Sequence, residues 1–182
     1  LIENDDSLNK IVYVYPFNTL VEQNLASLNK IFGNSKAMNN IAVVNSTTPL
    51  KKDEDENFSD EYQKALLDRQ FLTYPIILAT HVGLFDTFFG NNRESAFGLC
   101  QYANSVIVLD EIQNYRIEIW NEIIIFLKEF AKILNLKIVI MSATLPDLEL
   151  LTDDRSNSVS LITNPQEYFL NPIFKDRVKT DY

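Results

Sequence analysis

Short apolar runs alternate with longer amphipathic segments along most of the chain. The runs are rich in Val, Ile and Tyr, which is typical of β-strands. They predict strands over residues 11–15, 41–44, 75–79, 105–109, 136–141 and 159–162. The longer segments carry apolar residues every three or four positions, as amphipathic helices do. They predict helices over residues 19–32, about 60–71, 80–89, 93–102 and 115–134.

The alternation of strands and helices predicts an α/β fold, a mainly parallel sheet with helices on both faces. In the helix after the first strand, Thr19 and Glu22 have the spacing of a capping box, and Gly33 is expected to end the helix. The longest predicted helix is expected to bury one side. That side consists of Ile119, Trp120, Ile123, Ile124, Leu127, Phe130, Ala131 and Leu134.

The composition is that of one ordinary globular domain, with 182 residues, 46% of them hydrophobic and 23% charged. The 25 acidic and 16 basic residues give a net charge of −9, which argues against avid, non-specific binding to nucleic acid. Six of the acidic residues lie within residues 51–62. We interpret this segment as a solvated loop and helix start.

Counts of single residue types exclude several further classes. None of the four glycines belongs to a GxGxxG or GxxxxGK[ST] motif, so the chain has no phosphate-binding loop of either kind. His81 is the sole histidine, which argues against a His-rich metal centre. Cys100 is the sole cysteine, so a reducing, cytoplasmic location is expected. The longest apolar run, near residues 123–127, is far shorter than the ~18 residues of a membrane span, and no secretory leader is expected.

Candidate chemistry follows the predicted strand 105–109. In parallel α/β sheets, ligands bind beyond the carboxyl ends of the strands. There the adjacent carboxylates of Asp110 and Glu111 could have two different roles. Asp110 could hold magnesium, and Glu111 could deprotonate a water that attacks a phosphate. The structural alternative, which we favour for an isolated pair, is that Asp110 or Asn114 merely caps the next helix.

A second candidate follows the next predicted strand. Ser142 and Thr144 place two hydroxyl groups at the same edge of the sheet as the two carboxylates. Such hydroxyls could bond a carboxylate and respond to the presence of phosphate. A Ser-Ala-Thr sequence before Pro146 is by itself an ordinary turn, whereas the two sites together are a more specific signal.

These residues resemble a known family. The segment 110–113, Asp-Glu-Ile-Gln, and the segment 142–144, Ser-Ala-Thr, are similar to motifs II and III of superfamily 2 helicases. Together with segments 14–24, 103–113 and 141–146, they resemble the helicase part of the CRISPR-associated helicase-nuclease of type I systems.

The resemblance implies an incomplete RecA-like lobe of an ATP-driven motor that acts on single-stranded DNA, with ATP and magnesium as cofactors. It implies catalytic roles for Asp110, Glu111 and Gln113, with Asp110 at the metal, and coupling roles for Ser142 and Thr144. The residues implied to line the nucleic-acid track are Pro16, Asn18, Thr19, Thr80 and His81. The implied partners are a CRISPR surveillance complex of the Cascade type, a second helicase lobe and a nuclease domain.

The chain departs from the family pattern because the Walker A loop, the His-Asp nuclease domain and the second lobe are missing from it. We therefore expect residues 1–163 to form a partial first lobe and residues 164–182 to form an exit linker, and we expect this fragment alone to be inactive. Two other hypotheses remain. One is another superfamily 2 member, such as a restriction-type translocase, and the other is a non-catalytic, truncated lobe that binds DNA or a partner. At the track, Thr19 and Thr80 could simply cap helices and His81 could be structural.

Overall fold

A computed structural model describes residues 6–33, 38, 40–44, 72–115, 119–143, 159–162, 164, 167–168, 170–171 and 173. The chain divides into two compact units, Leu1–Pro146 and Asp147–Tyr182. The sheet and its helices belong to the first unit. The proposed limit of the lobe at residue 163 stays a prediction.

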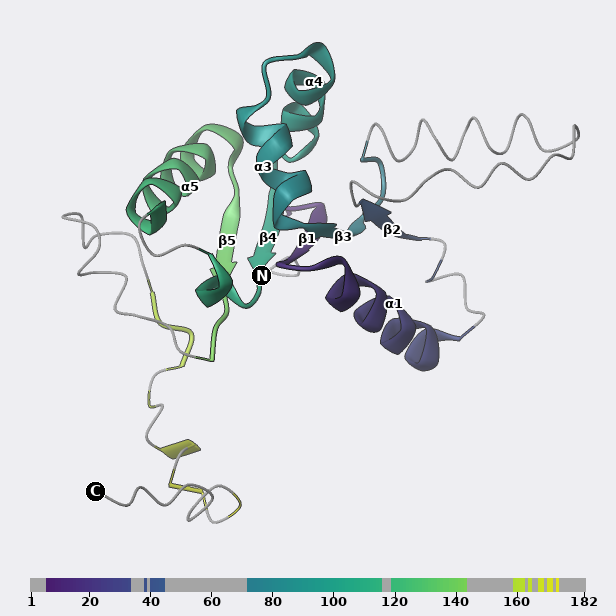
Figure 1. Cartoon of the computed structure of the whole chain (residues 1–182), viewed down its shortest axis with the longest axis vertical. Coiled ribbons are helices and arrows are strands. Elements are labelled where there is room, and N and C mark those ends of the chain that lie inside the picture. Colours follow the sequence, from purple (N-terminus) through teal and green to yellow (C-terminus); the bar gives the residue numbers. More distant parts are fainter. Residues whose placement is uncertain are drawn as a thin grey trace, which may run out of the picture. The chain divides into compact units, whose positions relative to one another are not determined.

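The first unit is built on a sheet of five strands in the order β2-β3-β1-β4-β5, and every neighbouring pair is parallel (Figure 1). The strands are β1 (Lys10–Tyr15), β2 (Ile41–Val44), β3 (Ile76–Thr80), β4 (Ser105–Leu109) and β5 (Lys137–Ile140). Each coincides with a predicted strand to within one residue at either end. The predicted α/β class, with a parallel sheet, is therefore confirmed.

Helices cover both faces of this sheet. The helices are α1 (Asn18–Phe32), α3 (His81–Phe89), α4 (Arg93–Gln101) and α5 (Trp120–Leu134), together with the short 3-10 helix η3 (Ile112–Asn114). Figure 1 shows α1 on the side of the sheet opposite to α3 and α5. No helix among the described residues is long and apolar enough to span a membrane.

The two faces bury alternate residues of the same strands, because successive side chains of a strand point to opposite faces. Toward α3 and α5, the largest apolar cluster combines strand residues such as Val12 and Ile107 with Leu84 and Leu127 of the helices. Toward α1, Tyr15 and Leu78 pack with Val21 in a second cluster. All five residues of β4 are buried, as expected for a strand that helices or neighbouring segments cover on both faces.

The start of α1 differs from the prediction. The helix begins at Asn18, Phe17 is its N-cap residue, and no side chain caps it. Thr19 therefore already lies inside the first turn, and the predicted capping box of Thr19 and Glu22 is wrong. The carbonyl oxygen of Phe17 instead accepts the N–H groups of the next turn. Gly33 ends the helix as predicted, with a φ of 55° that favours glycine.

The start of α5 also differs, since η3 and Tyr115 precede it and the helix begins at Trp120. Its N-cap residue is Ile119, without a side-chain cap, so neither Asp110 nor Asn114 caps this helix. Ile119 was expected to be buried but is 46% exposed, because it precedes the helix. The rest of the predicted buried side is buried or half-buried.

Two predicted elements have other outcomes. The segment 159–162 was expected to be a strand, but the described residues there form no strand. The predicted helix over about 60–71 lies outside the described residues.

The predicted helices over 80–89 and 93–102 are confirmed as α3 and α4 to within one residue at either end.

Candidate functional site at the carboxyl edge of the sheet

The strand register brings the predicted site residues to one edge. Tyr15 pairs with Thr80, and Leu109 pairs with both Val14 and Ile140, so the four strands end nearly level. The segments that follow them therefore leave the sheet side by side. This edge is where parallel α/β sheets bind their ligands.

Asp110 is held directly against the end of β1. Its backbone N–H donates to the carbonyl oxygen of Val14 at 3.0 Å, which extends the pairing of β4 with β1 by one residue. Its carboxylate accepts the N–H of Glu111 at 2.9 Å. The negative charge of Asp110 adds to burial in raising the pKa of Tyr13 and of Tyr15. The side chain of Asp110 is thus half-buried and lies beside two phenols.

Glu111 has a different environment because the backbone turns sharply at this residue. Its φ of 53° and ψ of 43° lie in the left-handed region, which is uncommon for a residue other than glycine and costs about 1–3 kcal/mol. Its carbonyl oxygen accepts the backbone N–H of Asn114 at 3.0 Å and the side-chain amide of the same residue at 3.1 Å. The strained turn is therefore held by two hydrogen bonds from Asn114.

A chain of side-chain hydrogen bonds joins the segments after β4 and β5. The side-chain N–H of Gln113 donates to the carboxylate of Glu111, and the hydroxyl of Ser142 donates to the side-chain oxygen of Gln113. Backbone bonds support this junction, since Met141 donates its N–H to Leu109 at 2.8 Å and accepts the N–H of Ile112 at 3.4 Å. The structure thus brings Glu111, Gln113 and Ser142 together. Thr144 lies outside the described residues.

The residues that follow β1 differ in accessibility. Pro16 is buried, Asn18 is half-buried and Thr19 is exposed. Phe17 lies between them and is 53% exposed, so its ring is available to a ligand. An exposed ring beside a helix start is compatible with stacking on a base.

Thr80 caps the helix that follows β3. Its hydroxyl oxygen accepts the N–H of Gly83 at 3.3 Å, and the residue is only 4% exposed. Thr80 therefore acts as a helix cap, which was the structural alternative to a role in nucleic-acid binding.

His81 lies between the segment after β1 and the segment after β4. Burial lowers the pKa of His81, and hydrogen bonding to the backbone of Tyr15 and Pro16 opposes this shift. Its ring lies 4.9 Å from the ring of Tyr115, centroid to centroid, with an interplanar angle of 59°. The sequence pattern indicated His81 but gave no sign of its contact with Tyr115, because that contact depends on how α3 packs beside η3.

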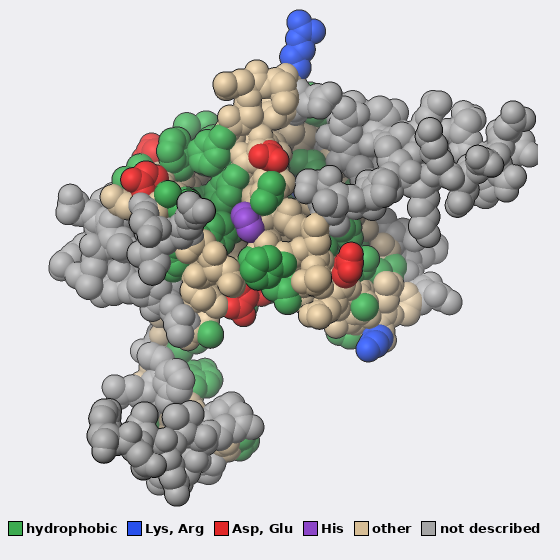
Figure 2. All heavy atoms as spheres, in the orientation of Figure 1, with side chains coloured by type: hydrophobic (Ala, Val, Ile, Leu, Met, Phe, Trp, Pro, Cys, Tyr) green, Lys and Arg blue, Asp and Glu red, His purple; other side chains and the backbone are tan. Residues whose placement is uncertain are grey.

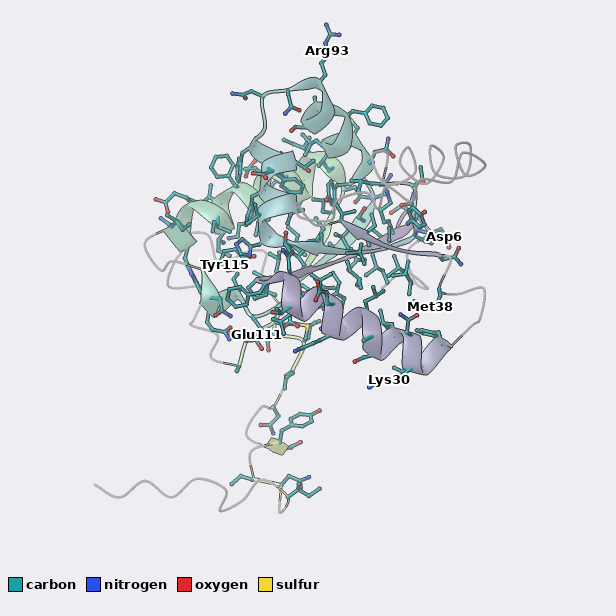
Figure 3. All side chains as sticks on the ribbon, turned by 45° about the vertical axis from the view of Figure 1, so that its right-hand side comes forward. Asp6, Lys30, Met38, Arg93, Glu111 and Tyr115 are labelled. Atoms are coloured by element: carbon teal, nitrogen blue, oxygen red, sulfur yellow. The ribbon has the colours of Figure 1, made fainter. Side chains whose placement is uncertain are left out.

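Charge is unevenly distributed around the described part of the molecule. On the face shown in Figure 2, the basic side chains of described residues lie away from the central region, where His81 is exposed to view. Arg93 and Lys30, labelled in Figure 3, lie at outlying ends of α4 and α1, whereas Glu111 and Tyr115 lie near each other. Among the described residues, the site therefore has no stripe of Lys or Arg.

The donor set suits a magnesium ion that arrives with a nucleotide. The described residues contain no group of three or more His, Cys, Asp or Glu side chains able to enclose a metal ion. Magnesium in ATPase sites keeps several waters and is held by one or two carboxylates together with phosphate oxygens. The single half-buried carboxylate of Asp110 fits that pattern, whereas a protein cage would need more ligands.

The sheet is parallel, two adjacent carboxylates follow β4, and one of them is linked through Gln113 to a hydroxyl after β5, which is the arrangement expected from the resemblance to a helicase lobe. The family model for DEAD/DEAH box helicases matches residues 1–151, and the chain belongs to this family. DEAD/DEAH helicases use ATP together with a divalent metal ion.

One similar solved structure is the crystal structure of the DUF1998 helicase MrfA, with 18% sequence identity and a TM-score of 0.49. The similarity covers 82% of this chain and 22% of the MrfA chain, so this chain spans about a fifth of that helicase. No curated protein matches the chain.

Proposed function

We propose that this chain is the catalytic edge of the first motor lobe of an ATP-dependent helicase or translocase that moves along single-stranded DNA. The observation that carries the proposal is the hydrogen-bonded chain from Glu111 through Gln113 to Ser142, next to Asp110. This arrangement places a carboxylate, an amide and a hydroxyl from two successive strands in one network. Such a network can link a reaction centre to a second segment that moves.

In this proposal Glu111 is the general base. Its carboxylate is held by the amide of Gln113, which fixes its position without neutralising it. A carboxylate held in this way can orient a water for attack on the terminal phosphate of ATP and accept its proton. Asp110 would hold magnesium, which would neutralise charge on the phosphates.

Ser142 and Thr144 act between hydrolysis and movement. The hydroxyl of Ser142 bonds Gln113 and does not contact the reacting atoms. It therefore transmits a change in the position of the Glu111 loop to the segment after β5. Thr144 follows two residues later in the same segment. We propose the same coupling role for it.

The nucleic-acid track consists of the residues after β1 and β3, namely Pro16, Asn18, Thr19, Thr80 and His81. Backbone N–H groups at helix starts bind phosphate without basic side chains, which is consistent with the acidic net charge. The start of α1 has no side-chain cap, which favours such a contact there. The start of α3 is already capped by Thr80.

At a finer level, we propose that the parent protein is the helicase-nuclease of a type I CRISPR system and acts in antiviral defence in the cytoplasm. The support is the joint occurrence of segments 14–24, 103–113 and 141–146. The partners would be a Cascade-type surveillance complex, the second helicase lobe and a nuclease domain. Degradation of a target bound by such a complex, and not of free duplex, would separate this assignment from a restriction-type translocase.

The deciding experiment compares Glu111→Gln with Asp110→Asn in the full protein that contains this chain. Positioned proton transfer contributes about 10² to 10⁴-fold, so Glu111→Gln should lower DNA-stimulated ATP turnover by at least about tenfold. Nucleotide affinity in magnesium should stay close to that of the wild type. Asp110→Asn should instead weaken magnesium-dependent nucleotide binding. Turnover in Glu111→Gln above a tenth of the wild-type value would contradict the general-base assignment.

A further inference from the structure

Tyr115 is anchored to the Glu111 loop through the backbone. Its N–H donates to the carbonyl oxygen of Ile112 at 3.0 Å, and its own carbonyl oxygen accepts the indole N–H of Trp120 at 3.2 Å. Asn114, its neighbour, is bonded to the carbonyl oxygen of Glu111. A displacement of the Tyr115 ring would therefore act on the turn that sets the position of Glu111.

The ring of Tyr115 contacts side chains of α3, the helix that follows β3. It lies 4.9 Å from the ring of His81 and 6.0 Å from that of Phe85, in an edge-on arrangement with the latter. His81 is the first residue of α3 and also interacts with the backbone of Tyr15 and Pro16. These two rings thus connect the segments after β1 and β3 with the segment after β4.

Each of the two residues has a buried polar atom for which the described residues offer no hydrogen-bond partner, namely Nδ1 of His81 and the hydroxyl oxygen of Tyr115. His81 interacts with the backbone of Tyr15 and Pro16. When Nε2 of a neutral imidazole carries the proton, Nδ1 is an acceptor. Burial raises the pKa of Tyr115 and lowers that of His81, so the phenol remains a donor and the imidazole remains neutral at pH 7.

A donor and an acceptor that lie unpartnered in neighbouring rings are unfavourable when buried, and a ring movement that brought the two atoms together would pair them. A hydrogen bond from Tyr115 to Nδ1 of His81 would give the two rings a second arrangement, different from the unpaired one seen here. Coupling between two sites requires an element with two discrete arrangements that both sites bias.

We propose that Tyr115 and His81 form a two-state contact through which nucleic acid at the ends of β1 and β3 controls the placement of Glu111. Both are positioning residues, and neither touches the reacting phosphate. This inference rests on the proposed function. It adds a connection between the track and the general base that is separate from the Ser142 network.

The test uses Tyr115→Phe in the full protein, with Tyr102→Phe as the matched control. Tyr102 is also a buried tyrosine, 1% exposed, and its hydroxyl interacts with Thr87 away from this edge. The readout is the ratio of ATP turnover with saturating oligo-dT to turnover without DNA. Coupling between sites is typically about 5- to 150-fold, so Tyr115→Phe should lower this ratio by at least fivefold. Tyr102→Phe should keep the ratio within about twofold of the wild type. If the effect of Tyr115→Phe came only from a general loss of structure, the two variants would lower the ratio alike.

A double variant tests whether the two residues act together. If they share one contact, Tyr115→Phe combined with His81→Phe should lower the ratio no further than the stronger single variant does. Multiplicative losses, or a Tyr115→Phe ratio like that of the wild type, would overturn the inference while leaving the proposed function standing. A wild-type protein whose ATP turnover does not respond to DNA would overturn both. Melting temperatures of all variants identify any that fail to fold.

Discussion

The hydroxyl of Ser142 donates a hydrogen bond to the side-chain oxygen of Gln113, across 29 positions of sequence. The amide of the same Gln113 donates to the carboxylate of Glu111, so its two ends hold two different segments. A glutamine suits this position because its amide group is both a donor and an acceptor. A glutamate there would place two carboxylates against each other. The bond to Ser142 therefore makes the segment after β5 sensitive to where Glu111 lies.

Loss of this bond should separate hydrolysis from movement. We expect Ser142→Ala, alone or with Thr144→Ala, to reduce strand displacement by the full protein far more than ATP turnover, because the hydroxyls do not touch the reacting phosphate. The measurement compares the two rates for the same preparation. Equal losses of both activities would refute a coupling role. A lowered melting temperature in that case would point to misfolding.

Binding to single-stranded DNA should depend only weakly on salt. Among the described residues, the segments just after β1 and β3 contain no Lys or Arg, so few counterions would be displaced there. For single strands the slope of log K against log[salt] is about −0.7 per phosphate neutralised, and we expect roughly three or fewer to be neutralised. Fluorescence anisotropy with oligo-dT from low to high salt measures the slope. A steep slope, or a clear preference for one base sequence, would favour the binding-module hypothesis.

The fold was largely predictable because each strand of this sheet is a compact apolar run. β4 is buried at every position, and its apolar sequence shows this directly. The errors lie at helix starts. Thr19 has the chemistry of a cap, but the chain already turns at Pro16 and Phe17, so the helix begins one residue earlier. After β4, the strained turn at Glu111 and η3 delay α5 to Trp120, which apolar spacing does not reveal.

The candidate site was predictable in part. The positions of Asp110, Glu111 and Ser142 follow from the rule that ligands bind at the carboxyl ends of parallel strands. The bridge through Gln113 and the contact of Tyr115 with His81 were not foreseen. Both depend on side-chain directions that are set by the left-handed turn and by the packing of α3. Those directions leave no periodic signal in the sequence.

Stability should fall on acidification partly through His81. Burial holds its pKa below the usual value of 6.5, so below about pH 6.5 the unfolded chain binds a proton that the folded protein resists. The stabilising contribution is therefore present above this pH and is lost as pH falls. We expect urea unfolding between pH 7.5 and 5.5 to show a larger loss for the wild type than for His81→Gln. An identical or larger loss in His81→Gln would contradict the lowered pKa.

Glycine is needed at position 90 because a β-carbon would not fit there, although the φ of Gly90 is unexceptional. A β-carbon at this position would lie 2.5 Å from the carbonyl oxygen of Asp86 and 2.1 Å from the hydroxyl of Ser95. Gly90→Ala should therefore destabilise the protein by about 1–3 kcal/mol, as overpacking does. Gly83→Ala is the matched control because its β-carbon would meet ordinary contacts at 3.6 Å. Comparable unfolding free energies for the two variants would show that the turn after α3 relaxes freely.

The 182-residue chain on its own should neither bind ATP tightly nor hydrolyse it. A phosphate loop supplies a lysine and a ring of N–H groups for the β- and γ-phosphates, and this sequence contains no such loop. Asp110 and Glu111 cannot replace it, because carboxylates repel phosphate unless a cation stands between them. Isothermal titration of the chain with ATP and magnesium is the direct measurement, and we expect no heat of binding at micromolar nucleotide. Micromolar affinity would mean that other residues of this chain hold the phosphates, and the roles proposed for Asp110 and Glu111 would then have to be rebuilt around that site.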